Sequence, residues 1–336
     1  MRILVTGANG FIGRILVQRL LATGVLRGTP ISTLILLDKE LSDFPEDNRL
    51  RRNLGSASDA ALLRRILADG IDVVFHLVSI PGGAAEAHYA QGYEVNLLAS
   101  LELLEQLRQQ PARPVLIYAS SVAVYGPSLA GRMDESARAC PELSYGSHKL
   151  MVEVALNDLA RRGEVDGRAL RLPGIVARPR APNGLRSAFM SDLLHAFAAG
   201  EPYCCPVSPQ ATAWWMSVRC CVDNLLHAAE VDEAALGGQR VWQLPLLHLS
   251  IAQIIDALAA VYGDQRRGLI TFASDEGLEA LFGRFPAMST PKARALGLRH
   301  DGSAAALVRN ALNPFSRTRR AHRVDDPAGV VAHEID

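Results

Sequence analysis

Residues Val5–Gly13 read V-T-G-A-N-G-F-I-G and place three glycines directly after the short apolar run Ile3–Val5. The first glycine can take a tight turn, the second lets the backbone approach a pyrophosphate, and the third lets a helix lie close on the strand. The N-terminus of that helix would offer N–H groups and a partial positive charge to the anion. The stretch therefore predicts a strand, a phosphate-binding turn and a helix that together hold a dinucleotide. The cofactor contacts expected of this turn are Gly7, Asn9, Gly10, Phe11, Ile12 and Gly13.

An acidic residue ends the next apolar run, Leu34-Ile35-Leu36-Leu37-Asp38. A carboxylate at that point accepts hydrogen bonds from the ribose hydroxyls of the adenosine. It also repels a 2′-phosphate, and no Arg follows immediately to accept one, so the sequence predicts NAD in preference to NADP. The alternative role for Asp38 is to cap the loop that follows.

Composition favours an enzyme that acts on small molecules. The chain has 336 residues, 49% of them hydrophobic, and its 35 basic and 35 acidic residues cancel. A net charge of zero leaves no electrostatic footprint for nucleic acid or for an anionic membrane. We expect a cytoplasmic protein, because no apolar run approaches the roughly 18 residues of a membrane-spanning helix and the chain begins directly with a strand. The five cysteines have neither a disulfide-framework nor a zinc spacing, so no metal site is expected.

Short apolar runs alternate with helical stretches through the first half of the chain. Residues 72–76 and 114–118 have the pattern of strands, and a helical stretch runs between them from about 86 to 109. A helix over 144–162 then leads into a strand over 167–172. This alternation predicts an α/β fold, namely a doubly wound parallel sheet of the Rossmann type.

The pattern changes after Pro173, where prolines and turns become frequent. Loops of this kind at the edge of a parallel sheet are where substrate pockets are usually built. The sequence therefore predicts an NAD-binding domain over residues 1–172 and a smaller lobe over 173–312, mainly for substrate, with some return to the core. Residues 313–336 lose periodicity and are expected to form a disordered tail.

A phenol and an ammonium group lie four residues apart in Tyr145-Gly146-Ser147-His148-Lys149, so they share one face of a helix. A Tyr can act as a base near neutrality only if its pKa falls from about 10, and a neighbouring Lys cation favours the phenolate. The run Ala119-Ser120-Ser121-Val122 leaves a core strand at the end where ligands of parallel sheets bind. His76, His148 and Cys140 are better explained as packing residues than as reacting groups.

Taken in order over about 180 residues, these motifs resemble the extended short-chain dehydrogenase/reductase family, also called the NAD-dependent epimerase/dehydratase family. The resemblance implies that Tyr145 is the acid/base, that Ser121 orients the substrate oxygen, and that Lys149 holds the nicotinamide ribose and lowers the pKa of Tyr145. Ser120 is the alternative for the serine role. Further residues that the resemblance places at the cofactor are Leu77, Asn96 and Pro173. One motif departs from the family, because Gly55-Ser56-Ala57-Ser58-Asp59 stands where Gly-Asp-x-x-Asp is common, and Ser56 is then the residue expected near adenine.

Residues 168–183, 188–189 and 235–245 are similar to the D-erythronate dehydrogenase group within this family. This resemblance implies oxidation of the C2 hydroxyl of a four-carbon sugar acid. The nucleotide-binding run typical of epimerases is replaced by Ala213-Trp214-Trp215-Met216-Ser217-Val218-Arg219-Cys220, and Val122 and Ala123 replace the two acids of the dehydratases. A small carboxylate needs a cationic or donor-rich clamp, which an arginine supplies in a two-point fork. Each candidate for this clamp could instead make a structural contact. The substrate-binding candidates are Ser79, Ser121, Tyr145, Arg178, Arg180, Asn183, Ser217 and Arg219.

Two other functions stay open at this point. One is a nucleotide-sugar epimerase, in which the hydride is removed and then returned, and the other is a non-catalytic NAD-binding regulator. The helices over 86–109 and 144–162 are apolar enough to pack against copies of themselves. The resemblance therefore implies a homodimer that is formed through a helix bundle.

Overall fold

The computed structural model describes residues 1–127, 129–180 and 186–315. Its largest part is a seven-stranded sheet in the order β13-β9-β7-β6-β1-β4-β5, in which every neighbouring pair is parallel. The order reverses between β1 and β6, and ligands of such sheets bind at the carboxyl ends of the strands next to that point. The strands are β1 (Arg2–Thr6), β4 (Thr33–Asp38), β5 (Leu50–Leu54), β6 (Val73–His76), β7 (Val115–Ser121), β9 (Asp166–Leu172) and β13 (Val241–Gln243).

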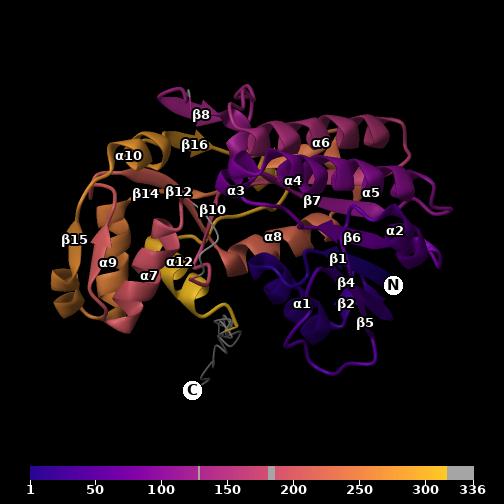
Figure 1. Ribbon diagram of the computed structural model, residues 1–336, viewed down its shortest axis with the longest axis horizontal. Coiled ribbons are helices and arrows are strands. Elements are labelled where there is room, and N and C mark those ends of the chain that lie inside the picture. The colour runs from indigo at the N-terminus through magenta and orange to yellow at the C-terminus, as the bar shows by residue number, and fades with distance from the viewer. Residues whose placement is uncertain (128, 181–185, 316–336) are drawn as a thin grey trace, which may run out of the picture.

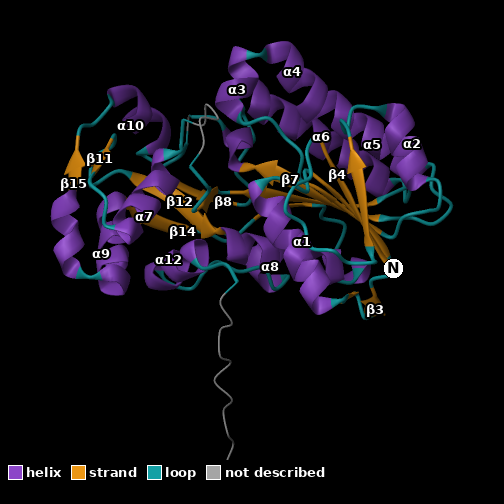
Figure 2. Ribbon diagram, turned by 60° about the horizontal axis from the view of Figure 1, so that its bottom comes forward, coloured by secondary structure: helices purple, strands orange, loops and turns teal. Residues whose placement is uncertain are grey.

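Two helical layers cover the sheet because successive side chains of a strand point to opposite faces. On β1, Ile3 and Val5 belong to one hydrophobic core and Leu4 belongs to the other. Helices α1 (Phe11–Thr23) and α8 (Val218–Glu230) close the first core, and α2 (Ala60–Leu67), α5 (Ala99–Arg108) and α6 (Ser144–Arg161) close the second. Figure 2 shows the sheet between these two layers. The predicted α/β fold with a parallel sheet is confirmed.

A second region lies beside the carboxyl ends of the strands (Figure 1). It contains the sheet β10-β12-β14 and a separate hydrophobic core to which α7, α9 and α12 contribute. Its larger elements are β10 (Gly174–Val176), α7 (Phe189–Ala199), β12 (Thr212–Ser217), β14 (Leu247–Ser250), α9 (Ile251–Tyr262) and α12 (Ala304–Leu312). The short elements of the chain are β2 (Val25–Leu26), β3 (Thr29–Pro30), α3 (Gly82–Ala87), α4 (Tyr89–Tyr93), η1 (Glu94–Leu98), η2 (Val122–Tyr125), β8 (Arg132–Asp134), β11 (Tyr203–Cys205), η3 (Glu233–Leu236), η4 (Asp264–Leu269), β15 (Ile270–Phe272), α10 (Glu276–Phe282), β16 (Ala287–Ser289) and α11 (Pro291–Ala295).

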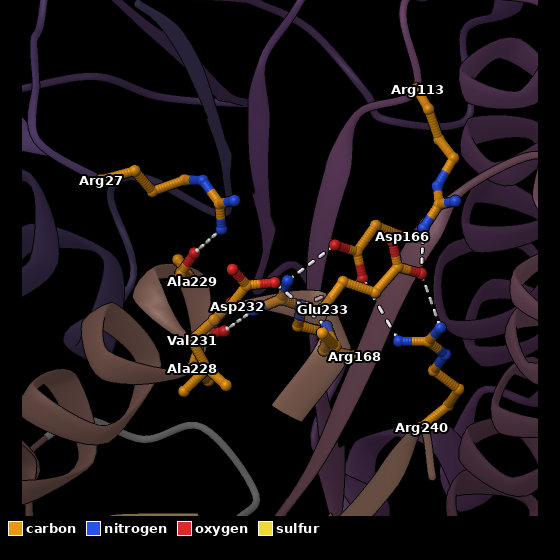
Figure 3. Close-up of polar contacts among 11 residues, drawn as sticks. Arg27, Arg113, Asp166, Arg168, Ala228, Ala229, Val231, Asp232, Glu233 and Arg240 are labelled. Atoms are coloured by element: carbon orange, nitrogen blue, oxygen red, sulfur yellow. Dashed lines mark hydrogen bonds and ion pairs between the residues drawn. The ribbon is translucent and has the colours of Figure 1, made fainter. Parts of the chain in front are cut away.

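Two buried arginines, Arg168 and Arg240, link the start of β9 to the end of α8 and to the segment before β13 (Figure 3). Asp166, at the start of β9, accepts two hydrogen bonds from Arg168 at 3.0 and 2.6 Å. The Arg168 guanidinium also donates to two main-chain carbonyl groups at the C-terminal end of α8, where a cation is favourable. Arg240 bridges Asp166 and Glu233. β13, which follows residue 172, pairs with β9 in the first sheet, and the division of the chain at that residue stays a prediction.

The helical stretch expected over 86–109 is interrupted, because His88 has a non-helical backbone (φ −128°, ψ 67°) and the π-helical turn η1 precedes α5. The tail expected over 313–336 falls almost wholly outside the described residues. No helix of the described ranges is long and apolar enough to cross a membrane.

Candidate active site

The glycine turn lies between β1 and α1 and is closely packed. Gly7 has a positive φ of +70°, and a Cβ there would lie 2.7 Å from the main-chain nitrogen of Val78. A Cβ on Gly13 would lie 2.2 Å from the carbonyl oxygen of Gly7, so only glycine lets α1 approach the strand this closely. No side chain of the described residues caps the N-terminus of α1, and Gly10 is exposed. The turn therefore leaves N–H groups available to a pyrophosphate, and these residues fit a dinucleotide.

Asp38 ends β4 beside this turn. Its Oδ2 atom accepts the N–H group of Asn9 at 2.8 Å, and its Oδ1 atom accepts the N–H group of Lys39 at 2.8 Å. The carboxylate thus caps the following loop, which is the alternative role, and also lies against the glycine turn where an adenosine ribose would come. Ser56 follows β5, and its Oγ lies 2.8 Å from that of Ser58.

Ser121, Tyr145 and Lys149 come together where β7 ends and α6 begins. Lys149 is 1% exposed, and its Nζ donates to the carbonyl oxygen of Ala119 at 2.7 Å. The same nitrogen lies 5.7 Å from the centre of the Tyr145 ring. Gly146 allows this approach, because a Cβ there would lie 2.3 Å from the carbonyl oxygen of Ala123. Sequence reasoning did not single out Gly146, although its place between Tyr145 and Lys149 was a signal.

Burial shifts the pKa values of this cluster. It raises the pKa of Tyr145 above its usual value of 10.0, and this outweighs the lowering by hydrogen bonds from Ser121 and Ser79 and by the charge of Arg178. Desolvation of the phenolate dominates this shift, and the lowering of the Tyr145 pKa by Lys149 stays a prediction. Burial also lowers the pKa of Lys149 to about 7, against the opposing charge of Glu153.

The loop after β6 brings Ser79 to Tyr145. Asn96, which is wholly buried in η1, clamps this loop: its Oδ1 accepts the N–H group of Ile80 at 2.7 Å and its Nδ2 donates to the Ile80 carbonyl at 3.0 Å. The amide group predicted to contact the cofactor is thus used to hold the loop. Leu77 begins the loop and donates its N–H group to Thr6.

His76, before the loop, is buried between the hydroxyls of Thr6 and Ser100. Burial and the charge of Lys149 lower its pKa to about 3, so the packing role expected for this histidine agrees with its surroundings. Pro173 is buried directly after β9.

Arg178 is the arginine among the substrate candidates whose charge acts on Tyr145. Its guanidinium lies 5.3 Å from the centre of the Phe11 ring, at the glycine turn. Within the described part of the chain, no carboxylate lies within 4.0 Å of it. Ser191 and His195 of α7 hold its main chain through hydrogen bonds of 3.0 and 2.8 Å. Burial lowers the pKa of Arg178, and interaction with Tyr145 opposes that shift.

The other substrate candidates are placed differently. Arg180 forms an exposed ion pair with Glu201 at 2.7 Å. Ser217 is wholly buried, caps α8 and donates to Asp301, so its hydroxyl is used in a structural contact. Arg219 lies in the first turn of α8. Asn183 lies outside the described residues.

The Ser120 hydroxyl donates to Glu153, a residue of α6 that sequence reasoning missed. This contact favours Ser121 for the serine role. Glu153 lies two helical turns after Tyr145 on the same face, and that spacing was the available signal.

A family model described as "NAD dependent epimerase/dehydratase family" matches residues 3–241. A D-erythronate dehydrogenase of Cupriavidus necator is 37% identical over 92% of this chain and 97% of its own. Another D-erythronate dehydrogenase, from Haemophilus influenzae, is 32% identical over 90% of this chain and 96% of its own. A nucleoside-diphosphate-sugar epimerase structure from Agrobacterium tumefaciens has a TM-score of 0.87 at 30% identity, covering 92% of this chain and 93% of that one.

Proposed function

Because the chain belongs to the NAD dependent epimerase/dehydratase family, we propose that it is a dehydrogenase that oxidises the C2 hydroxyl of a small sugar acid to the 2-oxo acid with NAD. Family membership makes the chain an NAD-dependent oxidoreductase. D-erythronate is the proposed substrate, because two relatives that match nearly the whole chain carry that name.

Each group near Tyr145 has a role in the proposed reaction. The Tyr145 phenolate takes the proton of the C2 hydroxyl, and the hydroxyls of Ser121 and Ser79 donate to the substrate oxygen as charge develops on it. Lys149 holds the nicotinamide ribose. Bound NAD supplies the hydride acceptor for the C2 carbon. The cofactor would be held by the glycine turn, Asp38 and the loop that begins at Leu77.

One observation supports an acid as the substrate: the Arg178 guanidinium lies over the Phe11 ring, and its charge acts on Tyr145. A partly buried cation without a carboxylate partner in the described ranges is costly, and a bound carboxylate would satisfy it with two parallel hydrogen bonds. The acid group of the substrate would then lie next to the carbon that is oxidised, as in a 2-hydroxy acid.

Incubation with D-erythronate and NAD tests the proposal. We expect NADH to accumulate in proportion to the acid consumed, and no NADH to form with erythritol, which has a similar carbon chain without the carboxylate. The second candidate function is nucleotide-sugar epimerisation, which the similarity to the Agrobacterium tumefaciens epimerase favours. Interconversion of UDP-sugars without release of NADH would support that function and contradict ours.

We predict that the protein binds NAD at least about tenfold more tightly than NADP, a difference of roughly 1.4 kcal/mol that arises from repulsion between Asp38 and the 2′-phosphate. Titration with each cofactor gives the two dissociation constants. The Asp38→Ala variant should narrow the gap, mainly by weakening NAD binding. Equal affinities in the parent protein would show that Asp38 does not face the ribose.

We also propose that the protein is a homodimer formed by α4, η1 and α6, which lie side by side (Figure 1). Large apolar side chains are exposed along this face, including Tyr89 (58%), Leu98 (43%), Met151 (45%) and Val154 (64%). Contiguous exposed apolar residues mark interfaces.

The Val154→Arg variant should be monomeric, because a dimer would have to bury the new charge at the centre of this face. Light scattering after size exclusion measures the mass of each species. Val25→Arg, which changes a 44% exposed valine of β2, is the matched control and should keep the mass of the parent. A parent protein that is itself monomeric at micromolar concentration would contradict the proposal.

A further inference from the structure

One buried carboxylate joins α6 and β7, which carry the catalytic cluster, to the neighbouring strand β9. We propose that Glu153 is a positioning residue for the proposed oxidation, whose negative charge keeps Lys149 cationic beside Tyr145 while its two oxygen atoms hold α6 against β7 and β9. This inference rests on the proposed function for its kinetic consequence, whereas the charge state of Lys149 can be measured separately.

Glu153 is buried, and both oxygen atoms of its carboxylate accept hydrogen bonds. The residue is 2% exposed, and its Oε1 atom accepts hydrogen bonds from the Ser120 hydroxyl and from Nε of Arg171 at 3.0 Å. Its Oε2 atom accepts from Nη2 of Arg171 at 2.7 Å. Arg171 in turn lies 5.0 Å from the centre of the Tyr125 ring. Because Ser120 precedes Ser121 on β7, the carboxylate fixes the strand end that carries the catalytic serine.

The charge of Glu153 bears on Lys149, one helical turn before it on the same face of α6. Tyr145 of α6, Tyr118 of β7 and His76 of β6 also surround the lysine. His76 is neutral near pH 7 because its pKa is about 3. Burial lowers the pKa of Lys149 to about 7, and Glu153 is the anion that raises it. Without that carboxylate, a buried amine would lose its proton at lower pH.

The effect of Glu153 on activity depends on the protonation states of Tyr145 and Lys149. The active pair, a Tyr145 phenolate with a Lys149 cation, holds as many protons as the inactive pair of a phenol with a neutral amine. The ratio of the two pairs is therefore independent of pH. Glu153 lies one helical turn from Lys149 and two from Tyr145, so its charge favours the cation more than it disfavours the phenolate. Above the titration midpoint of Lys149, removing this charge should lower turnover, and raising the pH further should not restore it.

The three lysines of the chain make the charge state measurable by NMR. Protein carrying Lys labelled with ¹³C at Cε gives three signals, and the Lys39→Arg and Lys292→Arg variants identify that of Lys149. In Glu153→Gln we expect the titration midpoint of Lys149 to fall by roughly one pH unit. We also expect kcat for the acid to fall by several-fold, and by less than about tenfold, at pH values above the Lys149 midpoint of the parent, with the NAD dissociation constant changed less than about threefold.

Asp158→Asn is the matched control, because Asp158 is an exposed carboxylate of the same helix that pairs with Arg161. It should leave the Lys149 midpoint and kcat at parental values. Glu153→Asp keeps the charge on a shorter side chain, and its Lys149 midpoint should stay within about 0.5 unit of the parent.

An unchanged midpoint in Glu153→Gln would overturn the proposal. If that variant does not fold, Glu153→Met, which also removes the charge, gives the same test: a midpoint that falls by about one unit supports the role of the charge, and an unchanged midpoint contradicts it. Absence of NADH formation with any sugar acid would refute the proposed function but leave the NMR result standing.

Discussion

The Tyr145→Phe variant is expected to lose turnover by roughly 10²- to 10⁴-fold while binding NAD nearly as tightly as the parent protein. The substitution keeps the ring, which packs at the start of α6, and removes the hydroxyl that exchanges the proton with substrate. Initial rates of NADH formation with D-erythronate measure the loss of kcat, and fluorescence titration measures the NAD dissociation constant. Tyr93→Phe is the matched control, since Tyr93 is a 37% exposed tyrosine of α4.

Two further variants separate the roles within the cluster. Lys149→Ala should weaken both turnover and NAD binding, because the buried ammonium is expected to contact the nicotinamide ribose and to favour the phenolate. Ser120→Ala should retain more activity than Ser121→Ala, since the Ser120 hydroxyl donates to Glu153. Ordinary turnover in Tyr145→Phe with the best substrate would refute the mechanism.

Sequence reasoning was strongest where a motif requires a particular backbone. Gly7 and Gly13 were predicted to allow a tight turn and a close helix, and added Cβ atoms would lie 2.7 and 2.2 Å from neighbouring main-chain atoms. The parallel sheet was predicted from the alternation of strands and helices, because each short apolar run forms a buried strand. Tyr145 and Lys149 come together because their spacing matches one helical turn.

The roles of polar residues were harder to predict, because they depend on partners that are distant in the sequence. Asn96 holds the main chain of Ile80, and Ser217 donates to Asp301, which lies 84 residues further along the chain. The pKa of Tyr145 likewise depends on how deeply the fold buries its hydroxyl. The distance in sequence between Tyr145 and Lys149 does not predict that burial. Glu153 was overlooked because its partners lie on β7 and β9.

Arg178→Met is expected to lower kcat/KM for D-erythronate by roughly 100-fold, mainly through KM. A charge-assisted hydrogen bond contributes about 1.5–3 kcal/mol, and the guanidinium would make two such bonds to the carboxylate. Arg178→Lys should recover part of the loss, because it restores the charge without the two-point fork. Steady-state rates over a range of acid concentrations at saturating NAD give both constants.

The matched control is Arg180→Met, which removes an arginine two residues away whose exposed side chain pairs with Glu201. It should change kcat/KM by less than about twofold, because exposed ion pairs contribute little. The NAD dissociation constant of Arg178→Met should also stay near that of the parent. The Arg178 guanidinium contacts the ring of Phe11, and the N–H groups of the glycine turn that would bind the pyrophosphate are not involved in that contact. A loss in Arg178→Met no larger than that in Arg180→Met would exclude Arg178 as the carboxylate anchor. Arg219, in the first turn of α8, would then be the next candidate for the carboxylate anchor.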